Sequence, residues 1–419
     1  MPQPNKYIVG REQEIKLFST FINSKSEQFI LNIYGPGGIG KSEICVKILD
    51  YSKKHNYLIA FIQIDSLNLT FDKVLYNIKE CLEEKIEGTG LKNYFSKFNK
   101  RLSEYLIVKE IIDRGGGYSA LFDALGSLVP DVLTKALTSV GKTVSDDLTR
   151  RFRDRYAIQQ YMNGAENWLT ESFIIGVKSI QSDTNDKIVI LFDTYEKIAT
   201  LDEWVCTTLI KSLPEKIKVV ITGRDRIQEM GFHWKEFTNQ IIPYEVVELD
   251  EDATKLFYNH HGLSDPVLLR STIDFTGGYP LCMTLAIDLS KKIGWDQVAG
   301  FKFKARRYEV ARQLLDRLLE QEEVLEVKDF LEKGVVTLWF DVQAIAYLLD
   351  TSIENAENIY HKISRFSFIQ PMEYGLKFHD KVREILLERL EYMDKDVAEN
   401  LLSRWRDYYL SRIDQQWIN

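Results

Sequence analysis

Short apolar runs alternate with amphipathic stretches through the first half of the chain. The runs occupy residues 29–35, 57–65, 187–193, 218–224 and 243–250. Each run is almost continuously apolar, which is typical of strands buried on both faces of a parallel sheet. Stretches with helical periodicity lie between the runs, as strand–helix–strand units require. We therefore predict an α/β fold with a parallel sheet, and we place this domain at residues 1–240.

A longer helical stretch, at about residues 85–181, interrupts the predicted sheet between its second and third strands. It is longer than a common crossover connection between strands. We expect a helical insertion that packs on the core of the domain. The charge-poor segment 114–144 leaves one alternative open, a surface for oligomerisation or membrane contact.

After the fifth run the pattern becomes mainly helical. We predict a small helical domain at 241–300, a winged-helix domain at 301–390 and a helical tail at 391–419. The winged helix is predicted because two helical patterns are followed by two short strands around the turn 373–375 and then by another helix.

The second helix of the predicted winged helix is poorly suited to reading DNA. It carries Glu354 and Glu357 beside Lys362 and Arg365, whereas a DNA-reading helix is expected to be basic. We therefore expect the domain to act as an intramolecular lid.

Composition narrows the class of protein. The chain has 419 residues, of which 45% are apolar and 28% charged, and this indicates a globular protein with several domains. A net charge of −8 argues against general nucleic-acid binding. The 4 cysteines are scattered, and neither a signal peptide nor a membrane-length apolar run is present. We expect a cytoplasmic protein with neither nucleic acid nor a membrane as its partner.

A glycine-rich segment directly follows the first apolar run and precedes a helical pattern. Residues 35–42 read GPGGIGKS and match the pattern G-x-x-x-x-G-K-[ST] at every fixed position. The candidate nucleotide-binding residues here are Gly35, Pro36, Gly37, Gly38, Ile39, Gly40, Lys41, Ser42 and Glu43. In such a P-loop, backbone N–H groups surround a phosphate chain, the lysine reaches the phosphates and the serine ligates Mg²⁺. The segment predicts binding of ATP or ADP with Mg²⁺.

Polar residues at two later strand ends complete a candidate catalytic set with Lys41. Asp193 ends the third run, at the sheet edge where α/β proteins bind ligands, and is expected to hold Mg²⁺ together with Ser42. Glu196 either polarises a water for attack on the γ-phosphate or is a solvated acid at a helix start. Arg224 ends the fourth run and is expected to bind a β- or γ-phosphate. These residues predict a slow ATPase.

The motifs and their order resemble one protein family. The segments are IVGREQEI (8–15), the P-loop, LFDTYE (191–196), ITGRDR (221–226), FTGGYPLCMTLA (275–286) and FHDKVREIL (378–386). They resemble the STAND NTPases, signal-transduction ATPases that include the NB-ARC and NACHT proteins of plant immunity, apoptosis and bacterial defence. The resemblance covers almost the whole chain, and GGYPL followed by FHD is its most specific part.

The resemblance implies roles for four more residues. Gly10 and Arg11 match a segment that lies against the nucleotide base. Pro280 matches a proline that packs on adenine, and His379 matches a histidine that touches the β-phosphate of ADP.

Two features of the family bear on the catalytic residues. In the family, the strand that ends in the phosphate-sensing arginine, here Arg224, lies between the P-loop strand and the acidic strand. The chain departs from the family where Phe378 replaces a methionine, and where Asp193 is followed by Thr-Tyr-Glu rather than by a second acid. The second departure leaves the hydrolytic role of Glu196 open.

The resemblance implies a molecular switch related to the AAA+ ATPases, acting in prokaryotic regulation or defence, including antiviral defence. ADP would hold the winged helix closed through His379, and ATP would permit a homo-oligomer to form. An effector or sensor protein would act in trans.

Two other functions stay open at this stage. One is an AAA+ DNA-binding ATPase of the origin-recognition kind, which also ends in a winged helix and would bind duplex DNA in a salt-dependent manner. The other is a scaffold that binds nucleotide tightly with little turnover, in which case nucleotide would not change the oligomeric state.

Overall fold

The computed structural model describes residues 9–64, 69–86, 93–113, 155–184, 186–301, 307–366, 368–372, 374–393 and 395–416. The chain divides into two compact units. The sheet unit consists of Ile15–Tyr34 and Lys47–Glu245, and the P-loop unit consists of Met1–Glu14, Gly35–Val46 and Val246–Asn419. The glycine-rich loop therefore groups with the C-terminal half of the chain.

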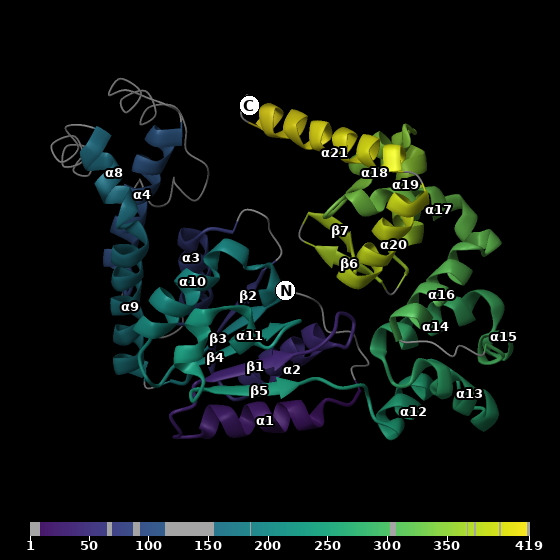
Figure 1. The fold of residues 1–419 in the computed structure, drawn as a ribbon, viewed down its shortest axis with the longest axis horizontal. Coiled ribbons are helices and arrows are strands. Elements are labelled where there is room, and N and C mark those ends of the chain that lie inside the picture. The colour runs from purple at the N-terminus through teal and green to yellow at the C-terminus, as the bar shows by residue number, and fades with distance from the viewer. Residues whose placement is uncertain are drawn as a thin grey trace. The chain divides into compact units, whose positions relative to one another are not determined.

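The sheet unit is built on five parallel strands in the order β2-β3-β4-β1-β5 (Figure 1). They are β1 (Ile30–Tyr34), β2 (Leu58–Gln63), β3 (Ile188–Asp193), β4 (Lys218–Gly223) and β5 (Ile241–Glu245). Every residue of β3 and β4 is buried, because both strands have a neighbour on each side. The α/β fold with a parallel P-loop sheet is confirmed, and β4 lies between β1 and β3 as the resemblance implies.

Four of the five strands lie inside their predicted ranges, but the fifth is shifted. It begins at Ile241 and ends at Glu245, whereas the sequence predicts 243–250. Pro243 is tolerated because β5 is an edge strand. The apolar residues that follow belong to the P-loop unit instead, where the Leu249 N–H donates to the Gly278 carbonyl at 2.9 Å.

The predicted helical insertion is confirmed in its described part. The α-helices described up to the fifth strand are α1 (Glu12–Asn23), α2 (Lys41–Lys54), α3 (Phe71–Ile86), α4 (Ser96–Asp113), α8 (Arg155–Asn163), α9 (Ala165–Thr184), α10 (Asp202–Trp204) and α11 (Ile227–Met230). Of these, α4, α8 and α9 pack against one another beside the sheet (Figure 1). Phe95 and Phe98 join this packing through Phe173, whose ring centroid lies 5.5 Å from that of Phe95. The segment 114–144 lies outside the described residues.

The P-loop unit is mostly helical. Its helices are α12 (Glu251–His260), α13 (Pro266–Thr276), α14 (Pro280–Ile293), α15 (Trp295–Ala299), α16 (Arg307–Leu319), α17 (Glu322–Lys333), α18 (Val342–Leu349), α19 (Ile353–Ile363), α20 (Asp380–Met393) and α21 (Lys395–Gln416). Several of these helices begin after a capping residue that is recognisable in the sequence. The Asp250 carboxylate accepts from the Ala253 N–H at 2.8 Å, and Asp265 caps α13 in the same way.

A winged helix follows the small helical region, as predicted. After α18 and α19, the strands β6 (Ile369–Met372) and β7 (Gly375–Phe378) form an antiparallel hairpin. Phe340 adds a bridge to Leu376 at the edge of this hairpin, with a Phe340 N–H to Leu376 O distance of 2.8 Å. None of the helices in the described ranges is both long enough and apolar enough to cross a bilayer. All four cysteines of the chain are free thiols.

Candidate functional site

The loop at 35–42 adopts a backbone that only glycine takes readily. Gly35, Gly38 and Gly40 have φ angles of 157°, 85° and 97°. A Cβ atom at Gly38 would also lie 2.9 Å from the Cβ atom of Leu281, which leaves no room for a side chain. Helix α2 begins at Lys41, so the loop ends at a helix N-terminus, which favours anions.

Five consecutive carbonyl groups of the loop, those of residues 35–39, each accept a hydrogen bond from a donor within the P-loop unit. The donors are the Lys41 ammonium for Gly35 and Pro36, the Tyr279 hydroxyl for Gly37, the Leu281 N–H for Gly38 and the Arg11 guanidinium for Ile39. In a trans peptide the C=O and N–H bonds point in opposite directions. Holding these carbonyls therefore fixes the direction of the N–H groups at residues 37–40. Of these, the Ile39 N–H donates to the Pro36 carbonyl at 3.4 Å.

Arg11 holds three segments of the P-loop unit together. Its Nη2 lies 2.6 Å from the Ile39 carbonyl, and its Nη1 lies 2.8 Å from the Val247 carbonyl and 3.1 Å from the Glu14 carboxylate. Both side chains of the Arg11–Glu14 ion pair are buried. Arg11 has a φ of 71°, a left-handed conformation that its contacts must stabilise. A contact between Arg11 and a nucleotide base stays a prediction.

Gly10 and Pro280 also lie where the P-loop unit is tightly packed. A Cβ atom at Gly10 would lie 2.9 Å from Leu249 Cδ2, so the glycine allows the chain to approach the segment before α12. A Cβ atom at Gly40 would lie 3.7 Å from Pro280 Cγ and 3.6 Å from Glu43 Oε2. Pro280 and Glu43 thus lie beside Gly40, and a contact of either residue with a nucleotide stays a prediction.

The sequence did not reveal the two residues that flank Pro280 as loop partners. Tyr279 and Leu281 bind the carbonyls of Gly37 and Gly38 directly. Both belong to the GGYPL segment, so the signal was present. Its meaning depends on a contact between segments that are more than half the chain apart.

Asp193 ends β3 inside a small network of the sheet unit. Its Oδ1 atom accepts hydrogen bonds from the Thr222 hydroxyl and from the Thr194 N–H, the latter at 2.9 Å. The side chain is buried, and Thr194 has a left-handed φ of 62°, which turns the chain sharply after the strand. Thr222, on the neighbouring strand β4, is a site residue that sequence analysis missed.

Glu196 and Arg224, which are also in the sheet unit, bind each other. The Glu196 Oε2 accepts from the Arg224 N–H at 3.1 Å, and its Oε1 lies 3.2 Å from Arg224 Nε. Glu196 therefore orients the strand end that carries the arginine. Their expected roles with water and phosphate stay predictions, since each side chain already has a protein partner.

A buried aspartate supports the turn that carries Glu196. Asp202 Oδ1 accepts from the Tyr195 hydroxyl at 2.8 Å and from Trp234 Nε1 at 2.9 Å, while Oδ2 lies 2.7 Å from His233 Nε2. Burial, and then the charge of Asp202, raise the pKa of Tyr195 well above its usual value, so the phenol remains a donor. Sequence analysis did not identify Asp202 as part of the site.

The pairing of β1 with β4 shows which residues follow the paired strand ends along the chain. Tyr34 at the end of β1 is in register with Gly223 at the end of β4. The glycine-rich loop starts at the residue after Tyr34, and Arg224 is the residue after Gly223. The carboxyl ends of β1, β3 and β4 thus all lead into candidate functional residues, as expected for a parallel sheet.

His379 has a structural role in the P-loop unit. Its N–H donates to the Phe368 carbonyl at 2.7 Å, and its Nδ1 accepts from the Lys381 N–H at 3.2 Å. The imidazole therefore caps the N-terminus of α20. A phosphate contact of His379 stays a prediction.

The sequence predicts two metal ligands, Ser42 and Asp193. Ser42 is exposed in the first turn of α2, and Asp193 offers a carboxylate in the sheet unit. Within the described ranges, His, Cys, Asp and Glu side chains do not form a cluster of three or more that could hold a metal. A Mg²⁺ ion held by a serine, one carboxylate and phosphate oxygens needs no such cluster.

No family model matches the chain, and no curated protein matches it. The chain is similar to the solved structure of Cdc6p from Pyrobaculum aerophilum, with 11% identity, 93% of this chain and 97% of that chain covered, and a TM-score of 0.38. It is also similar to the Orc1 protein of Aeropyrum pernix, solved in complex with DNA, with 12% identity, coverage of 97% and 94%, and a TM-score of 0.33. TM-scores this low carry no argument about function.

Proposed function

We propose that this chain binds ADP or ATP with Mg²⁺ at the loop 35–42, and that the bound nucleotide switches its state of assembly. One observation carries the first half of this proposal. Five successive loop carbonyls are held by donors of the same unit, and this fixes the direction of the N–H groups of Gly37, Gly38 and Gly40 for an incoming phosphate chain. Building such a frame is costly, and an anion-binding backbone explains it.

We assign the following roles to the residues of the site. The loop N–H groups and Lys41 bind the phosphates, Ser42 ligates Mg²⁺, and Pro280 packs on the base. The nucleotide supplies the phosphoanhydride bond, and Mg²⁺ supplies charge neutralisation. Because the Glu196 carboxylate is engaged by Arg224, it is a poor general base in this state, and we expect slow hydrolysis.

Slow hydrolysis suits a switch better than a motor. Tyr279 and Leu281 connect the loop to α14, so filling the loop acts directly on the helical region that leads to the winged helix. A ligand moves a two-state equilibrium only through its different affinities for the two states, and a nearly complete shift needs about 5.5 kcal/mol. The resemblance to the STAND NTPases supports this version of the proposal.

The DNA-binding alternative stays open, and one observation weighs against it. The Orc1 protein of Aeropyrum pernix was solved with DNA, but its likeness to this chain is too low to carry that property over. On α19, the exposed residues Glu354 and Glu357 place negative charge on the helix that would face DNA. Salt-dependent duplex binding through α19 would reverse this preference.

The loop is tested by Lys41→Ala. Because a hydrogen bond to a charged group contributes about 1.5–3 kcal/mol, we expect ADP affinity in calorimetry to fall by at least about tenfold. The matched control is Lys53→Ala, which removes an exposed charge from the same helix. Unchanged ADP affinity in the Lys41 variant, with both proteins folded, would refute the nucleotide site.

The switch is tested separately by His379→Ala. If His379 contacts the β-phosphate of ADP in the closed state, its removal should raise the fraction of oligomer that native mass spectrometry detects with ADP. Lys381→Ala serves as the control, because it keeps the cap at His379, whose partner is a backbone N–H. A wild-type protein that stays monomeric with both ADP and ATP would favour the scaffold function.

A further inference from the structure

Asp202 joins two segments of the sheet unit that follow neighbouring strands. The chain after β3 forms the short helix η1 (Tyr195–Lys197), and the chain after β4 leads through α11 into η4 (Phe232–Phe237). Asp202 is buried, so its carboxylate needs hydrogen-bond partners. These partners come from both segments, and they are Tyr195 in η1 and His233 and Trp234 in η4.

The backbone ladder of the sheet ends before these two segments. In the pairing of β3 with β4, the last pair is Phe192 with Ile221. Glu196 and Arg224 lie further along the chain than that pair. The position of Glu196 relative to Arg224 therefore depends on side-chain contacts, and the Asp202 carboxylate provides one set of them.

The turn that carries Glu196 depends on its surroundings for its shape. Thr194, which precedes η1, has a left-handed φ of 62°, and its side chain forms no capping hydrogen bond with a described residue. The next residue, Tyr195, is fully buried, and its ring centroid lies 6.0 Å from those of Phe192 and Trp234. The bond from the Tyr195 hydroxyl to Asp202 thus helps to hold the turn.

The last residue of β4 shows how closely this turn approaches the strand that leads to Arg224. A Cβ atom at Gly223 would lie 3.3 Å from Glu196 Oε2 and 3.5 Å from Tyr195 Cβ. Because Tyr195 and Glu196 are consecutive in one turn, a shift of the phenol moves the carboxylate as well. That carboxylate accepts from the Arg224 N–H at 3.1 Å. Asp202 can therefore act on Arg224 through Tyr195 and Glu196.

The segment after β4 is held at two points. At its start, the Ile227 N–H donates to Oδ1 of Asn32, a buried residue of β1, at 3.1 Å. Near its end, His233 binds Asp202, and a Cβ atom at Gly231 would lie only 2.5 Å from His233 Cε1. The glycine thus allows the imidazole to fold back. Asp202 ties the turn of Glu196 to a segment that the sheet already fixes.

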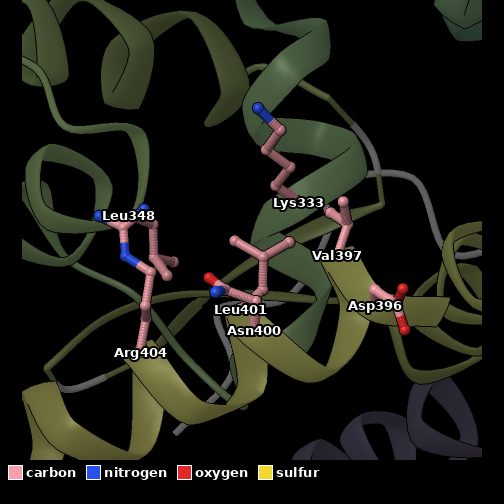
Figure 2. A pocket seen from close by; sticks show the side chains of 7 residues that line it. All are labelled: Lys333, Leu348, Asp396, Val397, Asn400, Leu401 and Arg404. Carbon is pink, nitrogen blue, oxygen red and sulfur yellow. The ribbon is translucent and has the colours of Figure 1, made fainter. Parts of the chain in front are cut away.

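A surface hollow in the P-loop unit provides a contrast with this network. It measures about 410 Å³, and Figure 2 shows Lys333 extending from α17 and Arg404 lying on α21. Lys333 Nζ lies 2.6 Å from Asp329, and Arg404 Nη2 donates to the Tyr347 carbonyl at 2.7 Å. Each cation has its own partner, so losing one contact leaves the other in place. At Asp202, three side chains from two segments share one carboxylate.

We propose that Asp202 is a positioning residue, which through Tyr195 keeps the Glu196 carboxylate on Arg224 and so sets the affinity of the site for ATP. This inference rests on the proposed nucleotide function. Weakening the contacts of Asp202 should destabilise the protein and yet raise ATP affinity, because Arg224 is released from its carboxylate. A purely structural role of Asp202 would lower stability without raising affinity.

The first test uses the full chain with Tyr195→Phe, which removes the hydroxyl bond to Asp202 and keeps the ring. ATP affinity in calorimetry should rise by about threefold, within the range of a partly exposed ion pair. The rise should be absent in a protein that already carries Arg224→Ala. The matched control is Tyr51→Phe, because the Tyr51 hydroxyl lies 2.7 Å from Ser19 Oγ within the same unit. The control should leave ATP affinity unchanged.

A second measurement does not depend on nucleotide. Because the Arg224 N–H donates to Glu196, its hydrogen exchange reports whether the carboxylate is in place. Exchange in peptides that contain Arg224, followed by mass spectrometry, should become several-fold faster in Tyr195→Phe. Glu196→Ala gives the rate for complete loss of the contact, and Tyr51→Phe gives the rate for a general loss of stability.

Faster exchange at Arg224 together with higher ATP affinity would support the proposal. Exchange no faster than in Tyr51→Phe, or an affinity change that persists with Arg224→Ala, would overturn it. A wild-type protein that binds no ATP would refute the proposed function, and the exchange rate would still decide whether Asp202 holds the contact. If Tyr195→Phe does not fold, His233→Ala removes another partner of Asp202 at a partly exposed position and is measured in its place.

Discussion

The glycine-rich loop and the strand-end residues hold their polar groups in opposite ways. In the loop, neutral backbone carbonyls are bound by donors from α14, Arg11 and Lys41. At the end of β4, two charged side chains bind each other, because the Glu196 carboxylate forms an ion pair with Arg224. The loop is thus prepared for an anion that comes from outside, whereas Arg224 must leave a carboxylate before it can bind a phosphate.

The largest effect is expected at Arg11, which is central to the loop frame. Arg11→Ala removes the donor for the Ile39 and Val247 carbonyls and leaves the buried Glu14 carboxylate without its charged partner. Breaking a buried ion pair from one side typically costs about 3–5 kcal/mol. We expect the free energy of unfolding, measured by chemical denaturation, to fall by this amount, and we expect ADP binding to be lost.

The control for Arg11 is Arg11→Lys, which keeps the charge near Glu14 but cannot form the same fork of hydrogen bonds. It should recover part of the stability and little of the ADP affinity. If Arg11→Ala binds ADP as the wild type does, the frame of carbonyls is not what prepares the loop, and the contrast with the strand ends fails.

An intermediate effect is expected for the Glu196–Arg224 pair. If Glu196 withholds Arg224 from phosphate, Glu196→Ala should raise ATP affinity, and Arg224→Ala should lower it. The coupling in a double-mutant cycle should be about 1 kcal/mol, since both side chains are partly exposed. The measurement is ATP affinity by calorimetry, with ATP turnover followed in parallel.

The cycle also separates two roles of Glu196. If Glu196 is a general base, its removal would lower ATP turnover and leave ATP affinity unchanged. If Glu196 positions Arg224, its removal would change ATP affinity, and this change would be absent in a protein that already carries Arg224→Ala. The second pattern would sharpen the contrast between the two regions, while the first would restore the role that sequence analysis left open.

Sequence reasoning predicted the parts of the fold that depend on local pattern. The buried strands, the caps at Asp250 and Asp265 and the winged-helix hairpin all follow from residues close together in the chain. The fifth strand was misplaced because Val246 and Val247 are as apolar as strand residues. Val246 is buried in the P-loop unit, where a Cβ atom at Gly35 would lie 3.5 Å from its Cβ atom, whereas Val247 is exposed.

The candidate site was predictable in its residue types but not in its partners. The pattern GPGGIGKS identifies a loop, and Asp193 and Arg224 follow from the strand ends. No local pattern indicates that Glu196 binds Arg224 or that Asp202 accepts from both Tyr195 and Trp234. These contacts arise from side-chain directions after folding, which a single sequence does not specify.

The smallest effect is expected at Tyr279, whose hydroxyl donates to the Gly37 carbonyl. Tyr279→Phe removes one neutral hydrogen bond, worth about 0.5–1.5 kcal/mol, and ADP affinity in calorimetry should fall by a few-fold. The matched control is Tyr258→Phe, because the Tyr258 hydroxyl bonds Thr276 at 3.0 Å within the same unit and does not reach the loop. Both variants should lose similar stability, but only the first should lose ADP affinity. Equal affinities would mean that the carbonyl of Gly37 needs no outside donor, and that the loop relies on Arg11, Lys41 and Leu281 alone.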